Sequence, residues 1–299
     1  MTWLDRQSFL GIDSDATLAR TRVAIIGLGG GGSHVVQQLA HIGIGHFVIV
    51  DDDAISDTNL NRLVGGTRLD VDQTIPKVEI ARRLILSVNP NAVVTVHNAK
   101  WQETAFELRD CDIVFGCVDN VRAKAELDSF CRRMQIPYID QGMDVHETAD
   151  GFLISGQVVL SMTGGPCLRC FGVVTDEALD EEARNYGAAG GRPQVVWPNG
   201  VLASSAVGLL VQLITPWHSG PIGALCLEYD GNRQTVQPSD RIPVLTRHGC
   251  PHHDERDLGD PRFDIRSLVK SPLAESANTS DRPRLFARVR SLIRSWIGS

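Results

Sequence analysis

Glycines and a carboxylate occur in one stretch early in the chain, at a spacing that suits a nucleotide. Gly27, Gly29 and Gly32 form a G-x-G-x-x-G turn, with Gly30 inside it. Glycines at such a turn let the backbone approach a phosphate, and a helix that follows offers its free N–H groups to the anion. Asp51 ends the next apolar segment, where a carboxylate can accept ribose hydroxyls. The stretch therefore predicts a nucleotide-binding site.

The charged residues after this turn indicate which chemistry to expect. Arg62 and Lys77 follow soon after, and Asp119 comes just after a later apolar segment. Hydride transfer has no need of two cations and a spare carboxylate around the phosphates. Attack on a phosphate needs cations for the developing negative charge and an acid for Mg²⁺. We therefore expect an enzyme that attacks a phosphate with the help of Mg²⁺, and an NAD-linked oxidoreductase is the less favoured alternative.

A second group of residues predicts a metal site in the latter part of the chain. Cys167 and Cys170 form a C-x-x-C, and Cys250 and His253 form a distant C-x-x-H. Three thiolates and an imidazole make a tetrahedral Zn²⁺ set, and four protein ligands leave no open position for water, so this zinc would be structural. His252 is an alternative fourth ligand, as is His248. Free thiols beside a surface histidine cluster are the competing interpretation.

Apolar periodicity indicates which elements carry these residues. Short apolar segments predict strands at 23–26, 47–50, 92–96, 112–117 and 137–140. Helical spacing of apolar residues begins at Ser33, Lys77 and Val121. This alternation predicts an α/β fold with a doubly wound, Rossmann-like, mostly parallel sheet. Ligands of such sheets bind at the carboxyl ends of the strands, where Asp51 and Asp119 fall.

The second half of the chain follows a different pattern. A segment at 152–160 predicts a β-rich second half without a helical crossover before the next motif. Residues 175–200, rich in Asp, Glu, Gly and Pro, are expected to form a mobile crossover loop. Residues 201–216 are apolar but too short to span a bilayer comfortably, so we expect a buried helix there and no membrane span.

Composition narrows the class of protein. The chain has 299 residues, enough to bury an ample core, and its net charge of −7 with a pI near 5.7 gives no case for nucleic acid binding. The N-terminus lacks a basic segment followed by an apolar core, so no secretory signal is visible. Seven cysteines, two of them in a C-x-x-C, fit a metal site in a reducing cytoplasm better than a disulfide framework.

Four segments carry a resemblance to a known family. In their order and spacing, VDDDAISDTNLNR, IPK, CVDN and PCLRC resemble the adenylation domain of the MoeB/ThiF and ubiquitin-activating enzyme superfamily, in its zinc-containing, bacterial-type single-domain form. The resemblance covers about residues 4–254. It implies an adenylation domain at 1–254, with an N-terminal arm at 1–20, a crossover loop at about 175–200 and a zinc site between 167 and 253. The family's usual second pair is C-x-x-C, so His253 departs from its pattern.

The resemblance also assigns roles in the nucleotide site. Asp51 would bind the ribose and Asp119 would hold Mg²⁺. The candidate nucleotide-binding residues are Gly27, Gly29, Gly30, Gly32, Asp51, Asp53, Asn59, Arg62, Lys77, Asp119 and Asn120. Asn59, Arg62 and Lys77 would hold the triphosphate.

The candidate catalytic residues include one from the N-terminal arm. Family members are usually homodimers in which an N-terminal arginine reaches the partner's ATP, and Arg6, in LDRQ, matches that arginine. An exposed surface arginine is the competing interpretation. With Arg62, Lys77 and Asp119, it completes the implied catalytic set.

The implied reaction is ATP-dependent adenylation of the C-terminal glycine carboxylate of a ubiquitin-like or sulfur-carrier protein. Further partners would be a conjugating enzyme or a sulfur donor. Adenylation of a small peptide or a tRNA by the same site is the main alternative, because family relatives include both. A non-catalytic scaffold within a heterodimer is less favoured, since one chain carries Arg6, Arg62, Lys77 and Asp119.

A cysteine expected of some family members is missing. Members that pass the activated protein to their own cysteine carry it in the crossover, and here the matching place is Asn185-Tyr186-Gly187. No cysteine lies between 171 and 225. Adenylation is therefore better supported than a thioester step, for which Cys117 or a partner protein would have to supply the nucleophile.

The family resemblance does not cover the end of the chain. Residues 255–280 are polar and predict a linker. The segment RPRLFARVRSLIRSWIGS then predicts a basic amphipathic helix, with Leu285, Val289, Leu292 and Trp296 on one side. Such a helix suits docking to a partner, lying on a membrane surface or capping the domain, and spacing alone does not choose.

Overall fold

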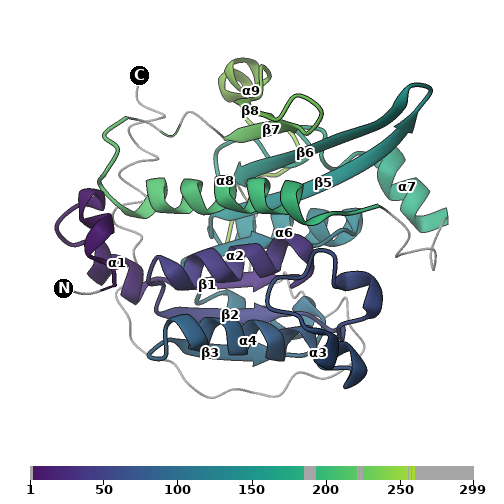
Figure 1. The fold of residues 1–299 in the computed structure, drawn as a ribbon. Helices are drawn as coiled ribbons and strands as arrows, with labels where there is room; N and C mark the ends of the chain where they lie inside the picture. The colour runs from purple at the N-terminus through teal and green to yellow at the C-terminus, as the bar shows by residue number, and fades with distance from the viewer. Residues whose placement is uncertain are drawn as a thin grey trace.

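A computed structural model describes residues 3–184, 193–220, 222, 225–254, 256 and 258–259. One sheet of eight strands runs through this part of the chain, in the order β3-β2-β1-β4-β5-β6-β7-β8 (Figure 1). The strands are β1 Arg22–Ile26, β2 His46–Val50, β3 Val93–His97, β4 Ile113–Gly116, β5 Tyr138–Thr148, β6 Gly151–Ser161, β7 Cys226–Asp230 and β8 Thr235–Pro238.

Helices lie on both faces of this sheet. The α-helices are α1 Ser14–Arg20, α2 Gly30–His41, α3 Arg68–Asp72, α4 Lys77–Val88, α5 Ala105–Leu108, α6 Val121–Arg133, α7 Asp176–Arg184, α8 Val196–Ile214 and α9 Ile242–His248. Three 3₁₀ turns, η1 Asp5–Leu10, η2 Asp57–Asn59 and η3 Trp101–Thr104, complete the described elements. The expected N-terminal arm thus consists of η1 and α1.

The first half of the sheet is parallel. Strands β3, β2, β1, β4 and β5 pair in parallel, as the predicted alternation of strands and helices requires. Strands β1, β2 and β4 and the first part of β5 are mostly buried, and all five strands contain short apolar runs, which is why the sequence revealed them. The helix expected from Ser33 begins at Gly30, because the glycines themselves form its first turn.

The second half is antiparallel and confirms the β-rich prediction. Strands β5 and β6 form a long hairpin, and β7 and β8 add to its edge. Residues 152–160 predicted nearly all of β6, whereas residues 137–140 predicted only the buried first part of β5. The outer part of β5 and the exposed strand β8 were not predicted.

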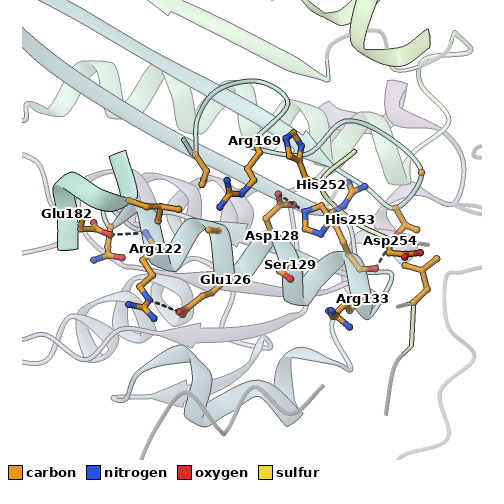
Figure 2. A pocket seen from close by; sticks show the side chains of 18 of the residues that line it. Arg122, Glu126, Asp128, Ser129, Arg133, Arg169, Glu182, His252, His253 and Asp254 are labelled. Atoms are coloured by element: carbon orange, nitrogen blue, oxygen red, sulfur yellow. Dashed lines mark hydrogen bonds and ion pairs between the residues drawn. The ribbon is translucent and has the colours of Figure 1, made fainter. Parts of the chain in front are cut away.

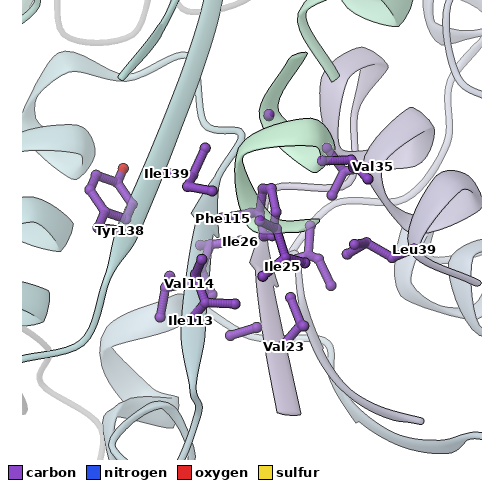
Figure 3. Close-up of a cluster of buried hydrophobic side chains, with 14 of the residues drawn as sticks. Val23, Ile25, Ile26, Val35, Leu39, Ile113, Val114, Phe115, Tyr138 and Ile139 are labelled. Atoms are coloured by element: carbon purple, nitrogen blue, oxygen red, sulfur yellow. The ribbon is translucent and has the colours of Figure 1, made fainter. Parts of the chain in front are cut away.

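The core lies between the sheet and its helices. Side chains of β1 and β4, among them Ile25 and Phe115, pack with Ile139 of β5 and with Val35 and Leu39 of α2 (Figure 3). Helices α2 and α8 pack against each other, and α8 also covers β5 and β6. Helix α6 covers β4 and β5 from behind in Figure 1.

Helix α8 is the apolar helix that the sequence predicted over residues 201–216. By length and composition alone it could cross a membrane, but more than half of its apolar window is buried inside the molecule. Leu202, Leu209 and Leu210 are among its buried residues. Burying each such side chain stabilises the fold by about 1.5–3 kcal/mol, so its apolar character is explained by the core.

The segment 175–200, which was expected to form a mobile crossover loop, is helical near both of its ends. Helix α7 takes up its first part, and α8 already begins at Val196. Acidic residues crowd the first turns of α7, where they favour a helix N-terminus, so composition alone misread a helix as a loop. The predicted place of a catalytic cysteine, Asn185-Tyr186-Gly187, lies outside the described residues, as do the linker and helix predicted after residue 259.

Candidate functional site

The glycine turn lies between the end of β1 and the start of α2. Gly27 has a φ of +87°, and a Cβ there would lie 2.7 Å from the carbonyl oxygen of Cys117. A Cβ at Gly32 would lie 1.9 Å from the carbonyl oxygen of Gly27. Larger residues would therefore push the strand, the turn and the helix apart. This tight approach leaves the first N–H groups of α2 at the carboxyl edge of the sheet.

Asp51 and Lys77 face this turn from the ends of β2 and α4. The Leu28 N–H donates to Asp51 Oδ2 at 2.6 Å, and the Asp53 N–H donates to Asp51 Oδ1 at 2.9 Å. Lys77 Nζ donates to Asp53 Oδ2 at 2.6 Å and lies 3.6 Å from Asp51 Oδ1. The lysine at the N-terminus of α4 is therefore balanced by two carboxylates, and a phosphate would have to compete with them.

Burial changes the proton affinity of the Asp51 carboxyl group. Desolvation raises its pKa above the ordinary value, and the nearby Lys77 ammonium and the two N–H donors work in the opposite direction. The side chain of Asp51 is 8% exposed, whereas that of Asp53 is 68% exposed. Asp51 is thus the inner carboxylate, tied to the glycine turn, and Asp53 is the outer one.

Asn59 and Arg62 lie on the loop between β2 and α4. Asn59 Oδ1 accepts the Ser56 N–H at 3.0 Å, so this side chain closes its own turn. Arg62 Nη1 donates to the Thr58 carbonyl oxygen at 2.6 Å, and the Arg62 side chain lies beside Gly30. Both residues therefore lie at the nucleotide edge, but each is held by a local hydrogen bond.

An ion pair between Asp70 of α3 and Arg83 of α4 stabilises this loop. Asp70 accepts hydrogen bonds from Arg83 at 2.8 Å and 2.7 Å and from the Thr67 N–H at 2.9 Å. The hydrogen bond from the Arg83 guanidinium is the main cause that holds the pKa of Asp70 well below its ordinary value. The loop that carries Arg62 is thereby fixed to α4.

Asp119 and Asn120 follow β4 and lead into α6. Asp119 is exposed at the sheet edge, and Asn120 Oδ1 accepts the Ala123 N–H at 2.8 Å, which caps α6. One turn later, Lys124 Nζ donates to both oxygens of the fully buried Asp140, at 2.7 Å and 2.8 Å. The start of α6 is therefore anchored to β5 directly beside Asp119.

One cavity of about 1280 Å³ unites these residues. Its described lining includes Gly27, Gly29, Gly30, Asp51, Asp53, Asn59, Arg62, Lys77, Asp119 and Asn120. The structure thus brings the predicted residues together at the carboxyl ends of the strands, with Gly32 buried just behind. A carboxylate, two cations and a second carboxylate around a glycine turn form a chemically suitable site for a nucleoside triphosphate and its divalent cation.

Sequence reasoning missed three residues of this cavity. Asn199 of α8 lies 2.6 Å from where a Cβ would stand on Gly30, and Gln141 of β5 lies 2.5 Å from the same point on Gly31. Lys124 of α6 is the third. The only sequence signal was polarity inside otherwise apolar elements, because these residues come from segments far from the glycine turn.

Arg6 lies away from this cavity in its own chain. It is exposed and is not among the described residues that line the cavity. Leu4, in the same segment, packs near Gly43, just before β2, and Figure 1 shows the N-terminal segment at the opposite end of the sheet from α3. A role for Arg6 at the nucleotide therefore requires a second copy of the chain.

Cys117 lines the cavity but is poorly suited to act as a nucleophile. Its sulfur accepts a hydrogen bond from Gln141 Nε2 at 3.2 Å, and burial raises the pKa of its thiol to about 12. The reactive form of a cysteine is the thiolate. Cys117 therefore stays protonated at neutral pH, which argues against the thioester role considered for it.

Three cysteines gather at the far end of the sheet, as the spacing predicted. The Sγ–Sγ distances are 3.7 Å from Cys167 to Cys170 and 3.7 Å from Cys170 to Cys250. Thiolates bound at about 2.3 Å to a tetrahedral zinc ion would lie roughly 3.8 Å apart. The three sulfurs therefore fit one Zn²⁺.

The fourth position differs from the expected His253. His252 Nδ1 lies 3.4 Å from the sulfurs of both Cys167 and Cys170 and 3.9 Å from that of Cys250. His253 Nε2 instead lies 3.9 Å from Asp128 Oδ2. Neighbouring side chains leave the backbone in different directions, so the short turn after Cys250 directs His252 to the sulfurs and His253 to α6. His248, at the end of α9, is exposed.

Comparison with known proteins identifies relatives along most of the chain. The model of the ThiF family matches residues 4–251. The SAMP-activating enzyme E1 of Haloferax volcanii is 27% identical over 259 residues, which are 84% of this chain and 88% of the relative. The sulfur carrier protein ThiS adenylyltransferase of Escherichia coli is 29% identical over 247 residues, 81% of this chain and 89% of the relative.

A solved structure has the same fold. The crystal structure of E. coli MccB with ATP superimposes with a TM-score of 0.64 at 22% identity and covers 82% of this chain and 74% of MccB. This likeness concerns the arrangement of the sheet and its helices.

Proposed function

The chain belongs to the ThiF family, and from that membership we propose that it adenylates the C-terminal carboxylate of a ubiquitin-like or sulfur-carrier protein. The observation that supports this most is the convergence of four separate segments on one cavity. The glycine turn, Asp51, Lys77 and Asp119 come from different elements, yet all line it. Two full-length relatives are, by name, an activating enzyme and an adenylyltransferase of carrier proteins.

The proposed reaction joins two anions. An oxygen of the terminal carboxylate attacks the α-phosphorus of ATP, the bond from that phosphorus to the bridging oxygen breaks, and pyrophosphate leaves with the bonding electrons. An acyl-adenylate remains. Lys77 and Arg62 line the cavity and would lower the repulsion between the anions, while the N–H groups of the glycine turn would hold phosphate oxygens.

Asp119 is the residue that we assign to Mg²⁺. It is exposed at the rim, so a hydrated cation bound to phosphates can reach it, and Mg²⁺ usually takes one or two carboxylates in such sites. When bound, the ion would neutralise phosphate charge. Asp51, tied to the glycine turn, would accept the ribose hydroxyls, with Asp53, Asn59 and Asn120 completing the wall.

We further propose a homodimer in which Arg6 of each chain completes the partner's site. Arg6 is not among the described residues that line the cavity, and the N-terminal segment that carries it lies at the opposite end of the sheet from α3, which supports a role in trans over a role in cis. An arginine delivered by the partner would place a positive charge beside the anionic triphosphate, where opposite charges attract.

The cysteine cluster and the free thiols support the location of this protein in a reducing compartment. All seven cysteines lie in the described part of the chain and are free. We assign a structural Zn²⁺ to Cys167, Cys170, Cys250 and His252, because these four ligand atoms lie within 4.8 Å of one another. Such a site with free thiols elsewhere is typical of the cytoplasm.

ATP–pyrophosphate exchange tests the proposed function. The full-length chain would be assayed with candidate small proteins that end in glycine, each paired with a variant lacking that glycine. Exchange should appear with the intact protein and vanish with the shortened one, because only the terminal carboxylate reaches the α-phosphorus. Exchange supported by a peptide or a tRNA alone would move the substrate to another class, and a change in nicotinamide absorbance without exchange would overturn the proposal.

A further inference from the structure

Helix α7 contacts the rest of the molecule through charged groups at its two ends and through Leu179 between them. None of its residues is buried, and Leu179 is only partly so. Near its start, Asp176 pairs with Arg169 at 2.7 Å. Near its end, Glu182 reaches α6 (Figure 2). Between these ends Leu179 packs against the core, and a cavity of about 620 Å³ lies between α6, α7 and the segment that carries His252 and His253.

The Glu182 carboxylate accepts hydrogen bonds from the N-terminus of α6. Its Oε1 accepts the Val121 N–H at 2.9 Å, and its Oε2 accepts the Arg122 N–H at 2.9 Å. The N–H groups in the first turn of a helix have no partner within the helix, and a carboxylate there is favoured by the helix dipole. Because Asn120 takes the next N–H, that of Ala123, all three free donors of this turn are satisfied by side chains.

This contact adjoins the residue assigned to Mg²⁺. Val121 is two residues after Asp119, and Asn120, Val121 and Arg122 all line the nucleotide cavity. On the side of the sheet, Lys124 fixes the same turn to Asp140. The first turn of α6 is therefore held from two directions, by Lys124 to the sheet and by Glu182 to α7.

We propose that Glu182 is a positioning residue: it ties α7 to the N-terminus of α6 and so fixes the turn that carries Asp119. It also keeps the donors of α6 from binding phosphate, which leaves the triphosphate to the glycine turn and the cations. The positioning of Asp119 for Mg²⁺ rests on the proposed function, whereas the attachment of α7 does not.

Amide hydrogen exchange tests the attachment without any assay of activity. Glu182→Ala is compared with Glu181→Ala, a matched control that removes the same charge from an exposed neighbour on α7. Glu182→Ala should speed exchange at Val121 and Arg122 on the order of tenfold to a hundredfold, since two hydrogen bonds to a charged group are lost. The control should leave these amides unchanged. Equal exchange in the two variants would overturn the proposal.

The Mg²⁺ dependence of adenylate formation tests the positioning. Glu182→Ala should need several-fold more Mg²⁺ for half-maximal rate, and a high Mg²⁺ concentration should restore kcat. Glu182→Gln, which keeps one acceptor, should fall between it and the wild type. A merely structural role of Glu182 would lower kcat or the melting temperature at every Mg²⁺ concentration. That result would overturn the proposed positioning of Asp119. A wild-type chain without adenylation activity would count against the proposed function, while the amide exchange would still decide the attachment.

Discussion

The nucleotide cavity and the cysteine cluster both collect polar groups from distant segments, but they differ in how those groups are balanced. In the cavity, Lys77 lies between Asp51 and Asp53, and Arg62 is bound to its own loop. The cluster consists of three cysteines and His252, and no lysine or arginine is among the described residues that form it. The charges of Lys77, Asp51 and Asp53 are thus paired within the chain, whereas the cluster offers four ligand atoms that fit one metal ion.

This difference separates the expected effects of mutation. A change in the cavity should reduce activity and leave the fold, because its charges already have partners in the chain. A change in the cluster should reduce stability, because a metal ion would join segments that are 80 residues apart. The following predictions test that contrast, beginning with the largest effect.

Loss of the metal should have the largest effect on the fold. Removal of the metal by a chelator, or His252→Ala, should lower the melting temperature by ~10 °C or more, because structural zinc contributes directly to folding free energy. His253→Ala is the matched control and should keep both the metal and the melting temperature nearer to the wild type. Metal content and thermal unfolding measure the two effects. If His252→Ala kept its zinc and His253→Ala lost it, His253 would be the fourth zinc ligand instead.

Asp119→Ala should show the opposite pattern. Loss of one charge-stabilising group typically costs about 2.7–4 kcal/mol of barrier, on the order of 10²–10³ in rate. ATP–pyrophosphate exchange should fall accordingly, and the melting temperature should stay the same because Asp119 is exposed. Exchange at the wild-type rate in this variant would remove Asp119 from the mechanism.

Arg6→Ala should reduce exchange by a similar factor, again on the order of 10²–10³. A mixture distinguishes action in trans from action in cis. When Arg6→Ala and Asp119→Ala chains are combined, each mixed dimer holds one site with both Asp119 and the partner's arginine, so activity should return. Action in cis would leave both sites of that dimer defective, and the mixture would stay inactive.

Acid should loosen the loop that carries Arg62. The folded pKa of Asp70 lies below its ordinary 3.8 because of Arg83, so the ionised form contributes stability above that value and loses it as the pH falls through and below it. From about pH 6 to about pH 3, the unfolding free energy of the wild type should therefore fall more steeply than that of Asp70→Asn. Denaturant unfolding at each pH measures both, and parallel slopes would count against this ion pair.

Cys117→Ser should have the smallest effect. A thiol with a pKa of about 12 contributes almost no thiolate at neutral pH, and serine keeps an acceptor for Gln141. ATP–pyrophosphate exchange, and transfer of the activated protein to any downstream acceptor, should stay near the wild-type rate. Loss of a thioester product with adenylation intact would instead identify Cys117 as the nucleophile.

The sequence by itself determined the nucleotide half of the fold. Strands β1, β2 and β4 are mostly buried, so their apolar runs are visible in the chain. Gly27 and Gly32 must be glycines because a Cβ at either position would collide with backbone atoms. Asp51 and Asp119 follow strands directly, so their place at one sheet edge follows from the parallel order. For this half of the fold, local spacing in the sequence was enough to predict the elements and the site.

Only the tertiary structure decided which distant side chains meet. Spacing did not distinguish His252 from His253, because their directions depend on the turn after Cys250 and on the position of α6. The attachment of Glu182 to α6 joins residues that lie 61 positions apart and leaves no pattern in the sequence. Such contacts depend on how elements pack, and a linear pattern reports only on the burial of each element.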